Sequence, residues 1–92
     1  MPIKSVKIVN MRGLHARAAA KFAQTAGRFD AEVQVSKDRQ TVGGRSIMGL
    51  MMLAGVPGSE IEIAVTGADE ATAFEALVKL VEDGFDEELA DP

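Results

Sequence analysis

Hydrophobic residues along the chain change their spacing several times, and each change indicates a new element. Within 4–9, Val6 and Ile8 share one face of an alternating segment, which predicts a strand. The spacing becomes helical over 16–26, and Gly27 is a natural end for that helix. The stripe that this helix is expected to bury consists of Ala18, Ala19, Phe22, Ala23 and Ala26.

The second half of the chain continues this succession. Alternation over 31–37 and 41–42, with a polar turn between, predicts a hairpin. Ser46 has a side chain suited to an N-cap, so a short helix is expected over 47–54. Strict alternation over 60–66 predicts another strand. A last helix is expected after Asp69, with Gly84 as its end and a buried stripe of Ala71, Phe74, Leu77, Val78 and Val81.

The resulting order, β-α-β-β-α-β-α, defines a fold class. Because alternate strand positions are polar, one face of the sheet should contact water and all the helices should cover the other. We therefore expect an α+β fold, an open-faced β-sandwich of four mostly antiparallel strands with three helices on one face. Residues 1–92 should form a single domain, with a frayed acidic tail over 85–92.

The composition of the chain narrows the classes of function that it could have. The chain is 47% hydrophobic and 26% charged, which is too apolar for a disordered protein. It has no cysteine, so disulfides and thiolate metal sites are excluded, and no metal-ligand cluster accompanies its one histidine. A net charge of -4, with four Phe and no Tyr or Trp, disfavours nucleic-acid binding. No segment is long and apolar enough for a membrane span, so we expect a cytoplasmic monomer.

The single histidine, His15, lies where the first strand pattern gives way to the first helix. The N-terminus of a helix attracts anions through unpaired backbone N–H groups and the helix dipole. A phosphoryl group on the ring would meet the backbone N–H groups of Ala16 and Arg17, which the nearer ring nitrogen, Nδ1, reaches most easily. A neutral imidazole is also a nucleophile.

Arg17 is close enough in sequence to place its guanidinium against phosphate oxygens. More ordinary interpretations exist for both residues. A histidine beside a glycine at a helix start is commonly a cap or a surface residue, and an arginine on a helix is commonly solvated. Position alone does not decide between these interpretations.

Two segments resemble the HPr family, the histidine-containing phosphocarriers of the phosphoenolpyruvate phosphotransferase system. The segment 13–17, Gly-Leu-His-Ala-Arg, is similar to the family's active-site motif, and 46–50, Ser-Ile-Met-Gly-Leu, to its regulatory-serine helix. The resemblance implies phosphorylation of His15 on Nδ1, with Arg17 binding the phosphate. It also implies enzyme I as donor, an EIIA-type protein as acceptor, and regulatory phosphorylation of Ser46 by an HPr kinase. Such a protein is a phosphoryl-transfer intermediate without turnover or cofactor of its own.

The match has one departure and leaves the pathway open. The family usually has proline after the arginine, where this chain has Ala18, a strong helix former, so we expect an unchanged fold and altered kinetics. The segments 29–33 and 84–88 look more like the nitrogen-related branch, NPr, which is regulatory. Sugar uptake and nitrogen-related regulation both remain open.

A partner surface is expected beside His15. Helical spacing puts Leu50, Leu53 and Ala54 toward the core. The opposite side would then expose Ile47, Met48, Met51 and Met52, an apolar patch suited to several partners unless the sheet curls over it. A polar strip of Arg17, Lys21, Gln24 and Arg28, with Arg45 nearby, could steer acidic partners, although a solvated helix face explains the same pattern.

Two other functions compete with a phosphocarrier. An enzyme with its own turnover would need further machinery, and the segment 43–46, Gly-Gly-Arg-Ser, lacks the spacing and lysine of a phosphate-binding loop. A non-catalytic regulatory binding module could act through the surface of Ile47, Met48 and Met51. A fold of this order does not by itself distinguish the two.

Overall fold

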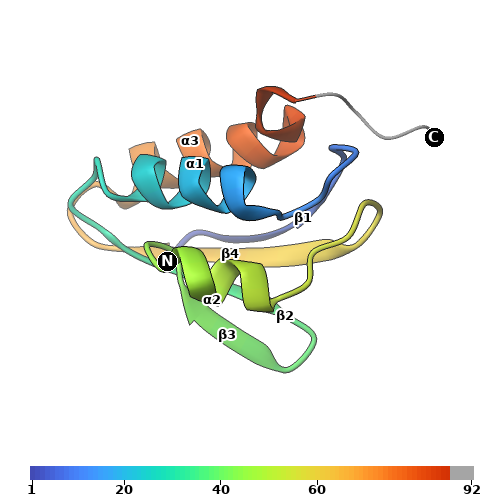
Figure 1. Ribbon diagram of the computed structural model, residues 1–92. Coiled ribbons are helices and arrows are strands. Elements are labelled where there is room, and N and C mark those ends of the chain that lie inside the picture. Colours follow the sequence, from blue (N-terminus) through green and yellow to red (C-terminus); the bar gives the residue numbers. More distant parts are fainter. Residues whose placement is uncertain (88–92) are drawn as a thin grey trace.

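The computed structural model describes residues 1–87, and its four strands form one antiparallel sheet (Figure 1). The spatial order is β1-β4-β2-β3, so the strand latest in sequence, β4, lies between β1 and β2. The strands are β1 (Ile3–Lys7), β2 (Glu32–Lys37), β3 (Gln40–Gly43) and β4 (Glu60–Thr66). The antiparallel pairing confirms the predicted sheet.

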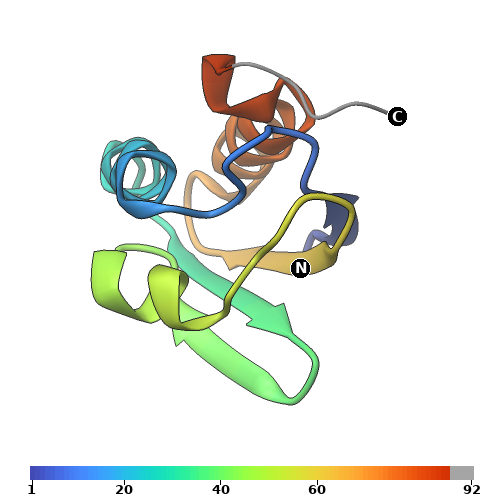
Figure 2. The same ribbon diagram turned by 45° about the vertical axis from the view of Figure 1, so that its right-hand side comes forward.

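Three helices cover one face of this sheet, as Figures 1 and 2 show from two directions. They are α1 (Ala16–Ala26), α2 (Ile47–Met52) and α3 (Glu70–Glu82), and a short 3₁₀ turn, η1 (Gly84–Asp86), follows α3. This arrangement confirms the β-α-β-β-α-β-α order and the open-faced sandwich. Within residues 1–87, no helix has the length and apolar character needed to cross a membrane.

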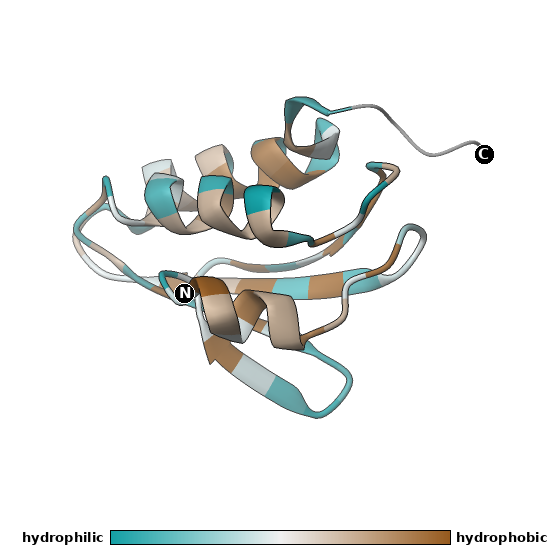
Figure 3. Cartoon of the chain, viewed as in Figure 1, coloured by the Kyte–Doolittle hydropathy of each residue, from teal (hydrophilic) through white to brown (hydrophobic). Residues whose placement is uncertain are grey.

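The alternation along β4 decides which face is covered. Ile61, Ile63 and Val65 are at most 1% exposed, whereas Glu60 and Glu62 are exposed on the other face. Figure 3 shows the same alternation as brown and teal bands along β4. A shift of one residue in register would place the isoleucines in water, so the sequence pattern determines which face of β4 is buried.

The core between the sheet and the helices includes Phe22 of α1, Leu50 of α2 and Leu77 of α3, all fully buried. The stripe predicted for α1 is confirmed in full. The stripe predicted for α3 is partly wrong, because Ala73 is buried while Ala71 is exposed. Residues 73, 77 and 81 are four apart and share one helix face, and residue 71 lies about 200° from residue 73 on the helix.

Two predictions need correction, one about the end of α2 and one about the acidic tail. Ala54 is exposed rather than in the core, because α2 ends at Met52 and Ala54 adopts a left-handed conformation with φ 54°. The predicted frayed tail is wrong for residues 85–87. Phe85 is fully buried, and its carbonyl accepts a hydrogen bond of 2.7 Å from Lys21 Nζ. Residues 88–92 of that tail lie outside the described residues.

A close approach between two loops fixes the segment before α1. Leu14 N–H donates to Gly55 O at 2.7 Å, and Gly13 has φ 63°. A Cβ on residue 13 would lie 2.3 Å from Gly55 O, which no side chain tolerates. Glycine is therefore required at residue 13, and the loop it forms brings the chain to the start of α1.

Candidate functional site

His15 is the N-cap of α1. Its backbone is extended, with φ −79° and ψ −179°, and its carbonyl accepts from Ala19 N–H at 2.8 Å. Its side chain makes no capping hydrogen bond. Because the first-turn N–H groups of a helix have no intrahelical acceptor, those of Ala16 and Arg17 are available to an anion bound at this end.

The imidazole of His15 contacts the carboxylate of Glu87. Nε2 lies 2.8 Å from Glu87 Oε2 and 2.9 Å from Oε1, and the two side chains are 24% and 14% exposed. Within residues 1–87 the ring forms its hydrogen bonds through Nε2 alone. An ionised carboxylate only accepts hydrogen bonds, so this contact favours the tautomer with its proton on Nε2 and its lone pair on Nδ1.

The side chain of Asn10 hydrogen-bonds to the carboxylate of this pair. It is fully buried in the loop before α1, and its Nδ2 donates to Gly13 O at 2.7 Å and to Glu87 Oε1 at 3.0 Å. Its Oδ1 has no hydrogen-bond partner within residues 1–87. One amide group therefore connects the loop of Gly13 to the carboxylate that contacts His15.

The environment of Glu87 favours its ionised form. Burial alone raises the pKa of this carboxyl, but hydrogen bonds from His15 and Asn10 and the charges of His15 and Lys21 outweigh it and lower the pKa from 4.5. The carboxylate is consequently charged throughout the neutral range.

The lowered pKa of Glu87 predicts an acid-dependent loss of stability. Below pH 4.5 the unfolded chain binds a proton at this residue before the folded chain does, so the stability that Glu87 contributes is present above pH 4.5 and is lost as the pH falls through the folded value. Urea unfolding at successive pH values should show the free energy of unfolding falling over this window, and falling less steeply for Glu87→Gln.

Asp86→Asn is the matched control for this measurement, since it removes an exposed carboxylate from the preceding position. It should keep the pH dependence of the wild-type protein. Equal slopes for Glu87→Gln and the wild type would contradict the argument.

Positive side chains gather beside Glu87. A cavity of about 290 Å³ is lined by the cations Arg12, Arg17 and Lys21, together with Met11, Asp86 and Glu87. Three cations face two carboxylates there, so the cavity has an excess of positive charge beside His15, which attracts an anion. The structure thus brings Arg17 and Lys21, both predicted from the sequence, to one cavity. Within residues 1–87, no group of three or more His, Cys, Asp or Glu side chains could hold a metal ion.

Comparison with known proteins identifies the family to which this chain belongs. The family model described as "PTS HPr component phosphorylation site" matches residues 3–83. The chain belongs to the HPr family. The phosphocarrier protein HPr of Neisseria meningitidis serogroup B is 52% identical over 84 residues, which is 91% of this chain and 94% of that protein. The phosphocarrier protein HPr of Treponema pallidum is 42% identical over 88 residues, 96% of this chain and 100% of that protein.

A solved structure agrees with these relatives. HPr-C-His from Thermoanaerobacter tengcongensis superimposes with a TM-score of 0.91 at 44% identity, covering 97% of this chain and all of that one. As a member of the HPr family, the chain is a phosphocarrier of the phosphotransferase system, a phosphoryl-transfer intermediate rather than an enzyme. Membership implies enzyme I and EIIA-type proteins as partners.

The other residues singled out in the HPr-like sequence are placed as follows. Ser46 is the N-cap of α2, and its Oγ accepts from Gly49 N–H at 3.0 Å. The predicted exposure of the apolar patch is confirmed, with Ile47 41%, Met48 73%, Met51 42% and Met52 68% exposed. Gln24 is exposed on α1, whereas Arg28 is exposed in the loop after it, because the helix ends at Ala26.

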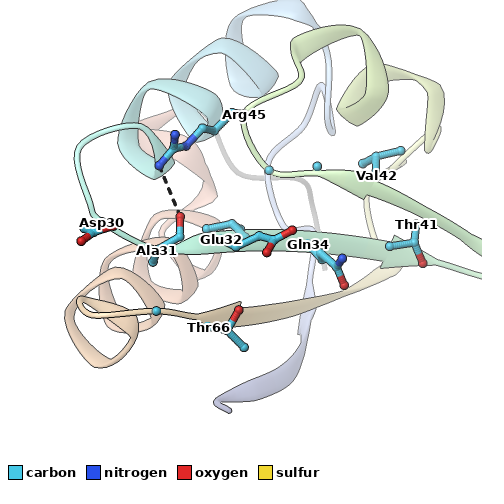
Figure 4. A pocket seen from close by; sticks show the side chains of 12 residues that line it. Asp30, Ala31, Glu32, Gln34, Thr41, Val42, Arg45 and Thr66 are labelled. Atoms are coloured by element: carbon cyan, nitrogen blue, oxygen red, sulfur yellow. Dashed lines mark hydrogen bonds between the residues drawn. The ribbon is translucent and has the colours of Figure 1, made fainter.

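Arg45 lies apart from the cavity that Arg17 and Lys21 line. Its Nη2 donates to Phe29 O at 3.0 Å and to Ala31 O at 3.3 Å, at the edge of a larger cavity of about 910 Å³ (Figure 4). Arg45 therefore ties the loop after α1 to the turn before α2, and its guanidinium is already engaged.

Sequence reasoning missed Asn10 and Glu87. No local pattern links Glu87 to the site, because it is 72 residues from His15 in the sequence. One signal was present: Phe85 is an apolar residue within an acidic segment and could have indicated that the segment docks. Asn10 had the weaker signal of a polar residue directly after a strand pattern.

Proposed function

We propose that His15 carries the phosphoryl group on Nδ1 when the protein acts as a phosphocarrier. Nδ1 attacks the phosphorus of the phosphorylated donor, an Nδ1–P bond forms, and the donor's bond to phosphorus breaks. The reverse events at the acceptor return the ring to its starting state. The observation that carries this proposal is the hydrogen bonding of Nε2 to Glu87 at 2.8 Å, which leaves Nδ1 as the nucleophilic nitrogen.

Ala16 and Arg17 stabilise the phosphoryl group in this proposal. Their N–H groups belong to the unpaired first turn of α1, and the helix dipole adds partial positive charge there. The Arg17 guanidinium lines the positively charged cavity beside Glu87, from which it can pair with phosphate oxygens.

Replacing Arg17 by Ala should slow phosphoryl transfer without unfolding the protein. A hydrogen bond to a charged group contributes about 1.5–3 kcal/mol, so we expect a rate about 10–100 times lower, measured by rapid quench with phosphorylated enzyme I. Arg39→Ala, an exposed cation in the β2–β3 turn, is the control and should transfer normally. A wild-type rate in Arg17→Ala would remove the residue from the site.

Enzyme I and an EIIA-type acceptor are the proposed partners, docking in turn on the apolar patch of α2. Ile47, Met48, Met51 and Met52 form this patch, and methionine side chains adapt to different partner surfaces. Acidic rims of the partners would contact Lys21 and Gln24 on α1, Arg28 in the loop after α1, and Arg45 before α2.

Met48→Glu should weaken transfer through binding. Met48 is 73% exposed, so the substitution should leave folding intact while it places a charge in a desolvated contact. We expect kcat/KM for transfer to fall about tenfold or more, mainly through KM. Ile3→Glu introduces the same charge at a 51% exposed apolar residue of β1 and should have no effect on transfer.

A regulatory binding module is the alternative, and the exposure of the patch favours it as much as docking for transfer. The two are separated by variants. If His15→Ala keeps cellular function while changes at Met48 and Met51 destroy it, binding without covalent chemistry is the function. Phosphorylation of His15 could also control such binding.

Several features are proposed from the family resemblance. Ser46 would be modified by an HPr kinase where one is present, adding negative charge beside the apolar patch and opposing acidic partners. The likeness of residues 29–33 and 84–88 to NPr supports a nitrogen-related role, while the relatives compared above bear the name HPr, and sugar uptake is the alternative. The whole chain would act as one cytoplasmic, monomeric domain.

One experiment tests the proposed function directly. The purified protein is mixed with phosphoenolpyruvate and enzyme I, and the added mass and its position are determined by mass spectrometry. Acid-labile phosphate on His15, assigned to Nδ1 by NMR, is the expected result. Labelling without enzyme I would indicate a self-sufficient catalyst, and absence of phosphate on the ring would overturn the proposal.

A further inference from the structure

A continuous chain of hydrogen bonds runs from the loop before α1 to the ring of His15. Asn10 Nδ2 donates to Gly13 O at 2.7 Å and to Glu87 Oε1 at 3.0 Å, and the Glu87 carboxylate accepts from Nε2 at 2.8 Å. The carboxylate comes from beyond η1, and its side chain is 14% exposed. The loop and η1 lie beside the N-terminal end of α1 in Figures 1 and 2.

We propose that Glu87 and Asn10 are positioning residues for phosphoryl transfer, which keep the proton of the neutral imidazole on Nε2 and neutralise the ring once it is phosphorylated. The proposal rests on phosphorylation of His15 at Nδ1, as proposed above, and names what orients that atom. Neither residue contacts the phosphoryl group in this scheme.

The first role concerns the tautomer. Histidine can carry its proton on either nitrogen, and the hydrogen bond of one nitrogen determines the state of the other. Both oxygens of Glu87 lie within 2.9 Å of Nε2, and a carboxylate cannot donate. A ring with its proton on Nδ1 would leave Nε2 and the carboxylate as two facing acceptors, so that tautomer is disfavoured.

The second role concerns charge. When Nδ1 forms its bond to phosphorus, the donor's bond breaks and the proton stays on Nε2, so the ring becomes a cation. The Glu87 carboxylate compensates that charge through a bond that is already formed. When the Nδ1–P bond breaks toward the acceptor, the lone pair returns to Nδ1 and the proton remains in place. No other reactant is required.

Asn10 holds the carboxylate in position. It is fully buried, its Nδ2 serves both the loop and Glu87, and its Oδ1 lacks a partner within residues 1–87. A buried polar side chain with an unsatisfied oxygen is costly for folding. In this proposal, the buried Asn10 is kept despite that cost because it orients Glu87 toward the ring. The groups around the pair are Arg12, Arg17, Lys21 and Asp86, and they stay unchanged in the variants below.

The test begins with the unphosphorylated protein, so it does not depend on any donor. Nitrogen-15 NMR of the His15 ring reports which nitrogen carries the proton. We expect one tautomer, protonated on Nε2, in the wild type at neutral to mildly alkaline pH. In Glu87→Ala we expect a measurable fraction protonated on Nδ1. Glu87→Gln, whose amide both donates and accepts, should also show a mixture and keeps the side-chain volume.

The second measurement uses limiting phosphorylated enzyme I. Loss of a hydrogen bond to a charged group should lower the equilibrium ratio of phosphorylated to free protein about tenfold in Glu87→Ala. Asn10→Ala should act in the same direction and should add little in the Glu87→Ala background, because its effect passes through Glu87. Glu75→Gln, which removes an exposed carboxylate of α3 outside that cavity, is the control and should match the wild type.

The outcomes separate this inference from the proposed function. An unchanged tautomer and an unchanged phosphorylation equilibrium in both Glu87 variants, with the wild type phosphorylated on His15, would overturn the positioning role alone. A wild type that accepts no phosphate, with the tautomer still dependent on Glu87, would overturn the proposed function alone. Circular dichroism of each variant shows whether it is folded.

Discussion

The His15→Ala variant is expected to accept no detectable phosphate from phosphorylated enzyme I. His15 is the single histidine of the chain, which also has no cysteine, so no other imidazole or thiol can replace it. The loss should be complete rather than partial, because the substitution removes the atom that bonds to phosphorus. Mass spectrometry of the donor-treated variant, without acid steps, makes the measurement.

The fold should survive this substitution. The His15 side chain makes no capping hydrogen bond to α1, so the helix loses no cap interaction when it is removed. Far-UV circular dichroism should therefore match the wild type, and Arg39→Ala serves as a variant that remains phosphorylated. Acid-labile phosphate on folded His15→Ala would place the acceptor elsewhere. A loss of helical signal would contradict a site built on a preformed helix end.

Among the variants described, Phe85→Ala should show the largest loss of unfolding free energy. Phe85 is the fully buried central residue of η1, and truncation of a buried phenylalanine costs about 3–5 kcal/mol. Because its carbonyl also holds Lys21 and its neighbour segment carries Glu87, loosening this turn should release the carboxylate from His15. Urea denaturation measures the first effect, and the tautomer of His15 measures the second.

Phe74→Ala is the matched control, the same change at a partly buried residue of α3. It should cost less in unfolding free energy and leave the ring of His15 unaffected. If Phe85→Ala lost no more stability than Phe74→Ala, the docking of residues 85–87 would contribute little, and the account of the carboxylate's placement would have to be abandoned.

The sequence predicted the elements that short-range patterns determine. Strict alternation over 60–66 matches β4, helical spacing over 16–26 matches α1, and Ser46 caps α2 as expected. The strand predicted over 4–9 is shifted and shorter in the structure, at Ile3–Lys7, because pairing with β4 ends at Lys7. Boundaries depend on the partner strand, which periodicity does not identify.

The residues of the site also divide into those that a local pattern predicts and those that it does not. His15 and Arg17 were predicted because a glycine, a histidine and a helix start adjoin in sequence, so a local pattern places both at one helix end. Glu87 and Asn10 were not, because their contact depends on how α3 and η1 cross the start of α1, which only the tertiary structure determines. An amphipathic pattern shows which face of a helix is buried, but not which polar residue will lie beside a residue that is distant in the sequence.

The burial of Phe85 makes the position of Glu87 depend on a segment that follows every strand of the sheet. A chain that stops after α3 would have the imidazole of His15 but lack the carboxylate that contacts it. Cleavage just after Glu82 by a protease would return the mature molecule to that incomplete state while sparing every strand of the sheet. Under the proposed role of Glu87, such a cut should slow phosphoryl transfer, and the loss of Phe85 should also lower the free energy of unfolding.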